Sequence, residues 1–303
     1  MKKQLAKEPK VSIVILSYNY AEYIIDAINS VMNQDYNNIQ LIIVDDCSTD
    51  NSTEIIENLL DEYQFEFVKN ETNLGVNGAL LRGMSAVRGE YVSWLSCDDL
   101  IAPTKISDQI TYLVNNSLDV VYSSGYILTK TAKPKLMSME HIASKVAAGT
   151  ILEYLYVTDV AGPMIQSALV KTSLANSLFF IRQQFKSDDW ALTIKLFETG
   201  KAGFLNKPLF YYRLHDKNSH RDYWKTLPMR MDVVCNLTPP RLRNIAISNL
   251  LCSQAQYLVS DGKLVQGIQF FLSSLMIKFQ FRQIISLAKS FAKLTLKKLN
   301  LMY

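Results

Sequence analysis

The chain has 303 residues, 49% of them hydrophobic, and a net charge of +4. It is long enough for one large domain with an appendage, or for two domains. No stretch approaches the roughly 18 apolar residues of a membrane span, so this class of integral membrane protein is excluded. Lys2 and Lys3 are followed by a polar stretch and then by an apolar run too short for a signal peptide, which indicates a cytoplasmic protein.

The charge is unevenly spread along the chain. Residues 262–303 contain seven Lys or Arg and no Asp or Glu, whereas the rest contains 25 basic and 28 acidic side chains. The protein is therefore a slightly acidic body with a basic tail. Its four cysteines form no CxxC and no pairing pattern, and we expect reduced thiols.

Strands and helices alternate along the first hundred residues. Short apolar runs predict strands at residues 11–16, 39–44, 65–68 and 90–95. The segments between them have the apolar spacing of helices. This alternation predicts an α/β fold with a parallel sheet and right-handed crossovers.

The pattern changes after residue 100. A helix, a strand, a second helix and a further strand are expected at residues 105–115, 120–123, 188–199 and 203–212. Residues 129–148 are irregular in pattern and predict a binding loop or lid. Beyond about residue 225 only helical patterns remain.

Three acidic doublets stand out: Asp45-Asp46, Asp98-Asp99 and Asp188-Asp189. The first two directly follow predicted buried strands, and open α/β sheets bind ligands beyond the carboxyl ends of their strands. Four neighbouring carboxylates repel one another unless a cation or hydrogen-bond donors balance them. The sequence therefore predicts a site for a cation, a polar ligand or both.

Two common phosphate-binding loops are missing from the sequence. There is no GxxxxGK[ST], and Gly75, Gly78 and Gly83 lack the GxGxxG spacing. These absences disfavour a P-loop enzyme and a nicotinamide dehydrogenase.

Five short segments together resemble the inverting glycosyltransferase family 2. They are VSIVILSYN at residues 11–19, IIVDDCSTD at 42–50, NLG at 73–75, GEY at 89–91 and CDD at 97–99. Each segment is weak alone, but their order and spacing agree with the family over roughly residues 10–215. The resemblance implies the GT-A fold, a Rossmann-like, mostly parallel sheet with flanking helices. It also implies a nucleotide-sugar donor with a divalent cation, Mn²⁺ or Mg²⁺, on its diphosphate.

The resemblance also suggests a division of the chain. We expect an N-terminal tail at residues 1–10 and the GT-A catalytic domain at 11–225. Within that domain the nucleotide-sugar half covers about 11–100 and the acceptor half about 101–225. Residues 226–303 would form a helical C-terminal region that ends in a basic amphipathic tail.

By the resemblance, the ends of the first two predicted strands are expected to hold the nucleotide. Ser17-Tyr18-Asn19 can contact a nucleoside through backbone and hydroxyl groups. By the resemblance, Asp45 or Asp46 accepts hydrogen bonds from the base or ribose, and Asp46 is the expected base contact for a uracil nucleotide. UDP-sugars are therefore favoured. Alternatively, Asp46 and Ser48 merely cap the next helix.

The family's metal-binding DxD element falls on Ser96-Cys97-Asp98, so its first acid is missing here. Asp98 takes the position of the metal ligand, and Asp99 would contact the donor sugar or nearby backbone. Having one carboxylate fewer makes metal binding more dependent on the donor phosphates. His215, in the segment Arg213-Leu214-His215, is a second expected metal or phosphate ligand, or else an ordinary surface or core histidine.

Asp188-Asp189 resembles the family's Glu-Asp motif at a helix start. An inverting transfer needs a carboxylate that removes the proton of the acceptor hydroxyl, and we assign this general base to Asp189. Helix capping by Ser187 and Asp188 is the structural alternative, and both roles can hold together.

The C-terminal tail predicts an amphipathic helix. Ile284, Leu287, Phe291 and Leu294 lie on one side of it, and the basic residues lie on the other. Such a helix suits a peripheral contact with an anionic membrane, at the inner face of the cell membrane. Alternatively, it packs on the catalytic domain with its basic side in solvent.

Taken together, these features favour a metal-dependent inverting glycosyltransferase. It would transfer a sugar to a hydroxyl of a glycan or lipid-linked glycan acceptor in surface polysaccharide biosynthesis, with no nucleic-acid partner. A nucleotidyltransferase would need a Gly-, Arg- or Lys-rich phosphate loop after the first strand, where the chain has Ser17-Tyr18-Asn19-Tyr20. A degenerate glycan-binding or scaffold protein is the third hypothesis, which only Ser96 favours.

Overall fold

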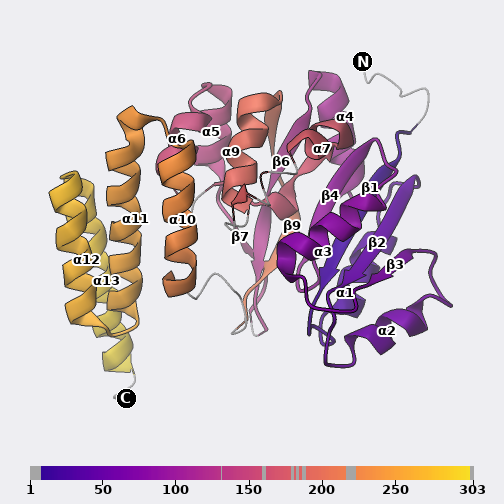
Figure 1. Ribbon diagram of the computed structural model, residues 1–303, viewed down its shortest axis with the longest axis horizontal. Helices are drawn as coiled ribbons and strands as arrows, with labels where there is room; N and C mark the ends of the chain where they lie inside the picture. Colours follow the sequence, from indigo (N-terminus) through magenta and orange to yellow (C-terminus); the bar gives the residue numbers. More distant parts are fainter. Residues whose placement is uncertain are drawn as a thin grey trace. The chain divides into compact units, whose positions relative to one another are not determined.

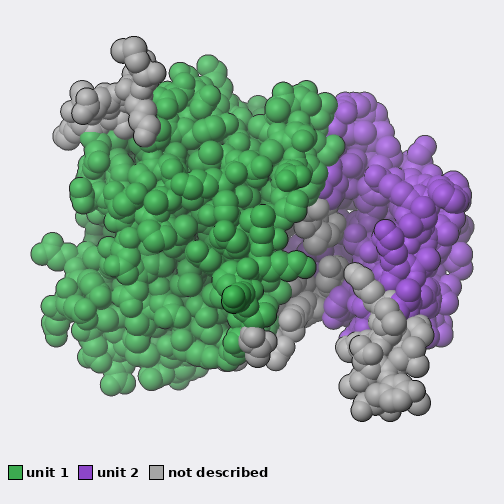
Figure 2. Space-filling model, turned by 180° about the vertical axis from the view of Figure 1, so that it is seen from behind, with its two compact units in different colours: residues 1–150, 163–217 green, residues 151–162, 218–303 purple. Residues whose placement is uncertain are grey.

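A computed structural model describes residues 8–130, 132–158, 162–178, 181, 184–185, 189–215 and 223–300. The chain divides into two compact units (Figure 2). Unit 1 comprises Met1–Thr150 and Pro163–Lys217, and unit 2 comprises Ile151–Gly162 and Asn218–Tyr303. Unit 2 therefore takes in a short segment from the middle of the region that the sequence pattern assigns to the acceptor half.

Unit 1 is built on one mixed sheet (Figure 1). Its strands, among the described residues, are β1 (Val11–Ser17), β2 (Ile39–Asp45), β3 (Glu66–Lys69), β4 (Tyr91–Ser96), β5 (Leu100–Ile101), β6 (Val120–Leu128), β7 (Lys135–Leu136), β8 (Leu169–Lys171) and β9 (Ala202–Arg213). The strand order is β3-β2-β1-β4-β8-β6-β9-β5, and β7 pairs with β6. The four strands from β3 to β4 are parallel, as are β6 and β9, while β8 lies antiparallel between β4 and β6. The predicted α/β fold with a mostly parallel sheet is confirmed.

Helices connect and flank these strands. Those of unit 1 are α1 (Ile24–Met32), α2 (Ser52–Leu59), α3 (Gly75–Ser85), α4 (Lys105–Asn116), α5 (Glu140–Ala147), α7 (Thr172–Leu178) and α9 (Asp189–Thr199). The region predicted to be irregular, residues 129–148, contains β7 and α5. This prediction was wrong because neither element has a strong periodic signal: β7 has two residues and is specified by its partner β6, and Ile142 is the buried residue of α5.

The alignment of β2, β1 and β4 positions the acidic doublets. The apolar residues of β1 from Val11 to Ile15 are buried, because this strand is covered on both faces. In register, Ser17 pairs with Asp45 of β2, and Leu16 pairs with Ser96 of β4. The carboxyl ends of the three strands therefore lie at one edge of the sheet, and both doublets leave the sheet there.

Unit 2 is helical. It contains α6 (Ile151–Val157), α10 (Tyr223–Leu237), α11 (Pro240–Ser260), α12 (Leu264–Ile277) and α13 (Phe281–Asn300), and α11 packs against α10, α12 and α13 (Figure 1). Leu287 of α13 is buried with Ala255 and Val259 of α11, and Phe291 and Leu294 join this cluster. The sequence pattern suggested a membrane contact for this apolar side of α13. Its residues Leu287, Phe291 and Leu294 are instead used for packing inside unit 2. In the part of the chain that is described, no helix combines the length and apolarity needed to cross a bilayer.

One buried cation lies in the core of unit 1. Lys105, at the start of α4, is fully buried. Its Nζ donates hydrogen bonds to Ser93 Oγ at 2.8 Å and to the Ala168 carbonyl at 3.4 Å. Both acceptors are neutral, and burial lowers the pKa of Lys105 to about 7.

We predict that Lys105→Met stabilises the protein at neutral pH. The folded pKa lies below that of an unfolded lysine, so the unfolded state binds more protons between about pH 7 and 10. The free energy of unfolding should therefore rise with pH across this window, by at most about 1.4 kcal/mol per pH unit. Methionine removes this rise, and Ser93 Oγ still donates to the Ala168 carbonyl at 2.8 Å.

Urea denaturation at pH 7 and pH 9 measures this effect. The exposed ion-paired Lys69 supplies the control, because Lys69→Met should leave the pH dependence unchanged. A rise with pH that persists in Lys105→Met would contradict the role of this lysine.

Candidate functional site

Asp45, at the end of β2, organises the loop that follows it. Its buried carboxylate accepts hydrogen bonds from Ser48 N at 2.8 Å and from Ser48 Oγ at 2.6 Å. The helix-capping alternative paired Asp46 with Ser48, but it is Asp45 that holds this serine. Asp45 therefore shapes the loop from inside.

Asn19 joins this loop to the end of β1. Its Oδ1 accepts hydrogen bonds from Thr49 N at 2.7 Å and Asp50 N at 3.3 Å, and its own N donates to Ser48 Oγ at 2.9 Å. Asn19 has φ of 58°, a left-handed conformation that asparagine tolerates better than most residues. The two loops thus form one connected polar platform.

The other residues of the Ser17-Tyr18-Asn19 segment differ in accessibility. Ser17 is buried, and the Ser17 backbone carbonyl accepts a hydrogen bond from Asp46 N at 2.9 Å. The Tyr18 side chain is 44% exposed. Of the two, Tyr18 offers the side chain that a ligand can reach.

Asp46 connects β2 to the segment before α3. Its Oδ1 accepts hydrogen bonds from Asn70 Nδ2 at 2.8 Å and Leu74 N at 2.9 Å. No hydrogen bond to its Oδ2 is formed by the residues that the structure describes. The second acid of this doublet therefore keeps an acceptor atom for a ligand.

The Asp98-Asp99 doublet meets His215 at the same edge of the sheet. His215 Nε2 lies 2.9 Å from Asp98 Oδ2, and both side chains are more than nine-tenths buried, at 6% and 7% exposure. The imidazole stacks on Tyr23 at a centroid distance of 5.3 Å and meets the edge of Tyr20 at 5.5 Å. These rings fix the orientation of the histidine.

Strand pairing explains why residues 117 positions apart come into contact. β5 directly follows the doublet and pairs with the end of β9, with Leu100 opposite Tyr211. Arg213 then donates a hydrogen bond from its N to Asp99 Oδ1 at 2.9 Å and from its Nε to the Asp98 carbonyl at 2.8 Å. The chain two residues further on presents His215 to Asp98.

Arg213 also reaches α1. Its Nη2 pairs with Asp26 Oδ2 at 3.1 Å, and its guanidinium lies over the Tyr23 ring at 4.8 Å. Sequence analysis named Arg213 only as part of the segment that contains His215, and it missed Tyr20 and Tyr23 as neighbours of this site. Their one sequence signal is their position directly after Ser17-Tyr18-Asn19.

The negative charge of the Asp98-Asp99 doublet is unfavourable in its buried position. Burial, followed by the neighbouring charge of Asp98, raises the pKa of Asp99 well above its usual range, against the opposing influence of Arg213. Asp99 Oδ2 is buried without a hydrogen bond of normal geometry, although the nearby Gln166 side chain also opposes the rise of the Asp99 pKa. A cation or a polar ligand at this place would relieve both effects.

A divalent cation fits Asp98 and His215 when its other ligands come from outside the protein. Carboxylate and imidazole are ligands that Mn²⁺ accepts, and Asp98 and His215 supply one of each. Within the described ranges, no group of three or more His, Cys, Asp or Glu could hold a metal ion. A cation here would thus complete its shell with substrate phosphates and water, the usual arrangement for Mg²⁺.

Asp189 comes from a different element. It is the first residue of α9 and is partly buried. Its charge contributes, after burial, to raising the pKa of Tyr122 in β6. Ser187 and Asp188, the predicted capping residues, lie outside the described residues.

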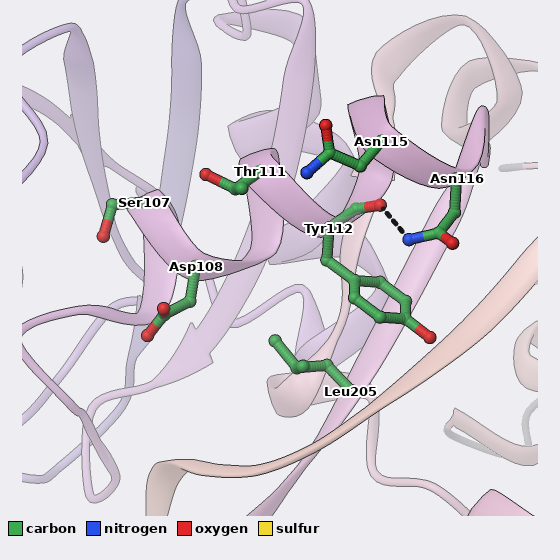
Figure 3. A pocket seen from close by; sticks show the side chains of 7 residues that line it. All are labelled: Ser107, Asp108, Thr111, Tyr112, Asn115, Asn116 and Leu205. Carbon is green, nitrogen blue, oxygen red and sulfur yellow. Dashed lines mark hydrogen bonds between the residues drawn. The ribbon is translucent and has the colours of Figure 1, made fainter. Parts of the chain in front are cut away.

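A cavity of about 410 Å³ lies elsewhere in unit 1 (Figure 3). It is lined by Ser107, Asp108, Thr111, Tyr112, Asn115 and Asn116 of α4 and by Leu205 of β9. None of the predicted site residues lines it, and Leu205 lies near the opposite end of β9 from Arg213. This cavity is therefore separate from the acidic site.

Known proteins share both the sequence pattern and the fold. Residues 12–162 match the sequence model of Glycosyl transferase family 2. The chain belongs to this family. The predicted resemblance is thus confirmed.

Two relatives show how far the similarity extends. An uncharacterized glycosyltransferase of Nostoc sp. is 31% identical over 226 residues, covering 70% of this chain and 66% of the relative, just under two thirds of its length. The Escherichia coli protein "UDP-Glc:alpha-D-GlcNAc-diphosphoundecaprenol beta-1,3-glucosyltransferase WfaP" is 29% identical, covering 74% of this chain and 85% of the relative.

Among solved structures, the mannosyltransferase PcManGT of Pyrobaculum calidifontis, in complex with GDP-Man and Mn²⁺, has a TM-score of 0.64 at 15% identity. The superposition covers 95% of this chain and 81% of that one. This likeness concerns the fold alone, and it confirms the predicted GT-A-type architecture of this family 2 chain.

The platform around Asn19 generates a stability prediction. Asn19→Ala removes the acceptor of Thr49 N and forces alanine into a left-handed conformation, so it should lower the free energy of unfolding by about 2–4 kcal/mol. Asn19→Gly loses the same acceptor without the backbone strain and should cost about 1–2 kcal/mol less than alanine. Denaturant unfolding of the two variants checks this order, and equal stability would contradict the strained loop.

Proposed function

We propose that the protein is a metal-dependent inverting glycosyltransferase. It transfers a sugar from a nucleoside-diphosphate donor, with UDP favoured, to a hydroxyl of a glycan or lipid-linked glycan acceptor in surface polysaccharide biosynthesis. The observation that carries this proposal is the common edge of β1, β2 and β4, where the Asn19–Asp46 platform and the Asp98–His215 pair leave the sheet. The relative WfaP, named for a UDP-Glc donor and an alpha-D-GlcNAc-diphosphoundecaprenol acceptor, supports the choice of substrates.

The two groups of residues divide the donor between them. Tyr18, Asn19 and Asp46 serve the nucleoside, with Asp46 Oδ2 as an acceptor for a base or ribose group. Asp98 and His215 hold the divalent cation, which neutralises charge on the leaving diphosphate when it is bound. The similarly folded PcManGT, whose structure contains GDP-Man and Mn²⁺, supports a divalent cation beside the donor.

Asp189 acts on the acceptor. Its carboxylate takes the proton from the acceptor hydroxyl as that oxygen attacks the anomeric carbon. The new C–O bond forms on the face opposite the breaking bond to the phosphate oxygen, and the nucleoside diphosphate leaves with that electron pair. This single displacement inverts the anomeric configuration.

The location of the acceptor sets the location of the enzyme. A polyprenyl-linked acceptor stays in the bilayer, so the enzyme works as a cytoplasmic protein in peripheral contact with the inner face of the membrane. The surplus of Lys and Arg after residue 261 suits the anionic lipids of that face.

The metal assignment predicts the effect of Asp98→Asn. An amide is a weaker ligand than a carboxylate for a hard cation, so the affinity for Mn²⁺ in the presence of UDP should fall at least about tenfold. Titration of Mn²⁺ followed by thermal shift measures this without turnover. Glu57→Gln, an exposed acid on α2, is the control and should bind Mn²⁺ normally. An unchanged Mn²⁺ affinity in Asp98→Asn would refute this ligand.

The base assignment predicts the effect of Asp189→Asn. Transfer to the acceptor should fall by about 10²–10⁴-fold because asparagine cannot accept the proton. UDP affinity should remain unchanged, because Asp189 comes from α9 and not from the donor platform. Release of nucleoside diphosphate, measured with and without Mn²⁺, reports turnover, and near-normal turnover in this variant would disprove the role of Asp189. Release of pyrophosphate instead would indicate a nucleotidyltransferase.

A further inference from the structure

One face of α12 is apolar and exposed. Val265, Ile268, Leu272 and Met276 follow one another at helical spacing, and their side chains are 43–87% exposed. Four such residues form a stripe about 16 Å long on one side of the helix. We call these four residues the α12 stripe.

The apolar surface continues beyond the end of α12. Ile277 and Phe279 lead into α13, where Phe281, Ile284 and Ile285 are also exposed. The opposite face of α12 is already used for packing, since Gly267 and Ser274 are buried, and on α13 Leu287 is buried against α11. The exposed residues are therefore additional to the packing of unit 2. Contiguous apolar surface of this kind marks an interaction site.

The charge around this surface identifies its partner. Residues 262–303 contain seven Lys or Arg and no Asp or Glu. Lys278, Arg282 and Lys289 are exposed on the segment that carries the apolar residues. The acid next to it in sequence, Asp261, is neutralised by an ion pair with Lys263 at 2.7 Å. The surface is thus apolar and cationic, which suits a layer of anionic headgroups over hydrocarbon.

We propose that the α12 stripe, with the turn to α13, is a docking surface for an anionic lipid bilayer. α12 lies in the plane of the interface with its stripe among the acyl chains, and the lysines and arginines contact the headgroups. A second copy of the chain fits less well, because a two-fold interface would set the same cationic surface against itself. This inference rests on the membrane contact proposed above, but it places that contact on α12 and on the exposed start of α13, because Leu287, Phe291 and Leu294 pack inside unit 2.

Vesicle co-sedimentation of the full chain tests the proposal. Wild-type protein should bind phosphatidylglycerol-containing vesicles, and pure phosphatidylcholine or high salt should weaken binding. The double variant Leu272→Gln/Met276→Gln changes no charge and alters residues that are 54% and 87% exposed, so folding should be unaffected. Its partition coefficient should fall at least about tenfold, because two apolar side chains no longer enter the bilayer.

The matched control carries the same kind of change on another exposed apolar pair. Ile25 and Met32 of α1 are 44% and 38% exposed, and Ile25→Gln/Met32→Gln should bind vesicles like wild type. Absent binding of the wild type, or equal binding by the α12 double variant, would overturn the proposal. So would a dimer in light scattering that the α12 variant abolishes, since the occupant would then be a second copy.

Donor hydrolysis in solution separates this inference from the enzymatic one. The α12 double variant should hydrolyse the donor at the wild-type rate, because none of its changes touches the acidic site. Vesicle binding without any hydrolysis would contradict the proposed activity and leave the docking surface intact. Hydrolysis without vesicle binding would support the proposed activity and contradict the docking surface.

Discussion

The register of three parallel strands is the constraint on which the site depends. β1 aligns with β2 so that Ser17 faces Asp45, and with β4 so that Leu16 faces Ser96. A shift of one residue would move every core side chain to the opposite face, and the buried apolar residues of β1 forbid that. The strand ends, and the acids that follow them, are therefore held together by packing far from the acids themselves.

The carboxylates at this edge of the sheet are tolerated because neighbouring hydrogen-bond donors stabilise their negative charge. Ser48 and Asn70 serve the first doublet, and Arg213 serves the second. Asp46 Oδ2 receives no hydrogen bond from the described residues, and Asp99 Oδ2 is buried without one of normal geometry. The doublets thus differ internally: the Asp45 carboxylate is held by its own loop, Asp46 Oδ2 remains available to a ligand, and Asp98 pairs with His215. Ser96 stands where the family's DxD element has its first acid, and the side chain that the fold brings to Asp98 is that of His215.

The sequence predicted much of this arrangement, for identifiable reasons. Long apolar runs and helical periodicity located β1, β2, β4 and α4 within a few residues, because burial selects those patterns directly. It missed β5 and β8, which have only two and three residues and are specified by their partners. β5 proved to matter for the site, since its pairing with β9 brings Arg213 and His215 to the doublet.

The sequence by itself determined the fold class, the family and the chemical types of the site residues, because local patterns and ordered motifs carry that information. Only the tertiary structure decided which neighbours each acid contacts. The contact of Asp98 with His215 and the engagement of Asp45 by Ser48 depend on strand pairing and loop geometry, which no local pattern records. The same holds for the C-terminal region: an amphipathic pattern cannot tell which apolar side packs on a neighbour. Leu287 of α13 packs against α11, whereas the α12 stripe is exposed.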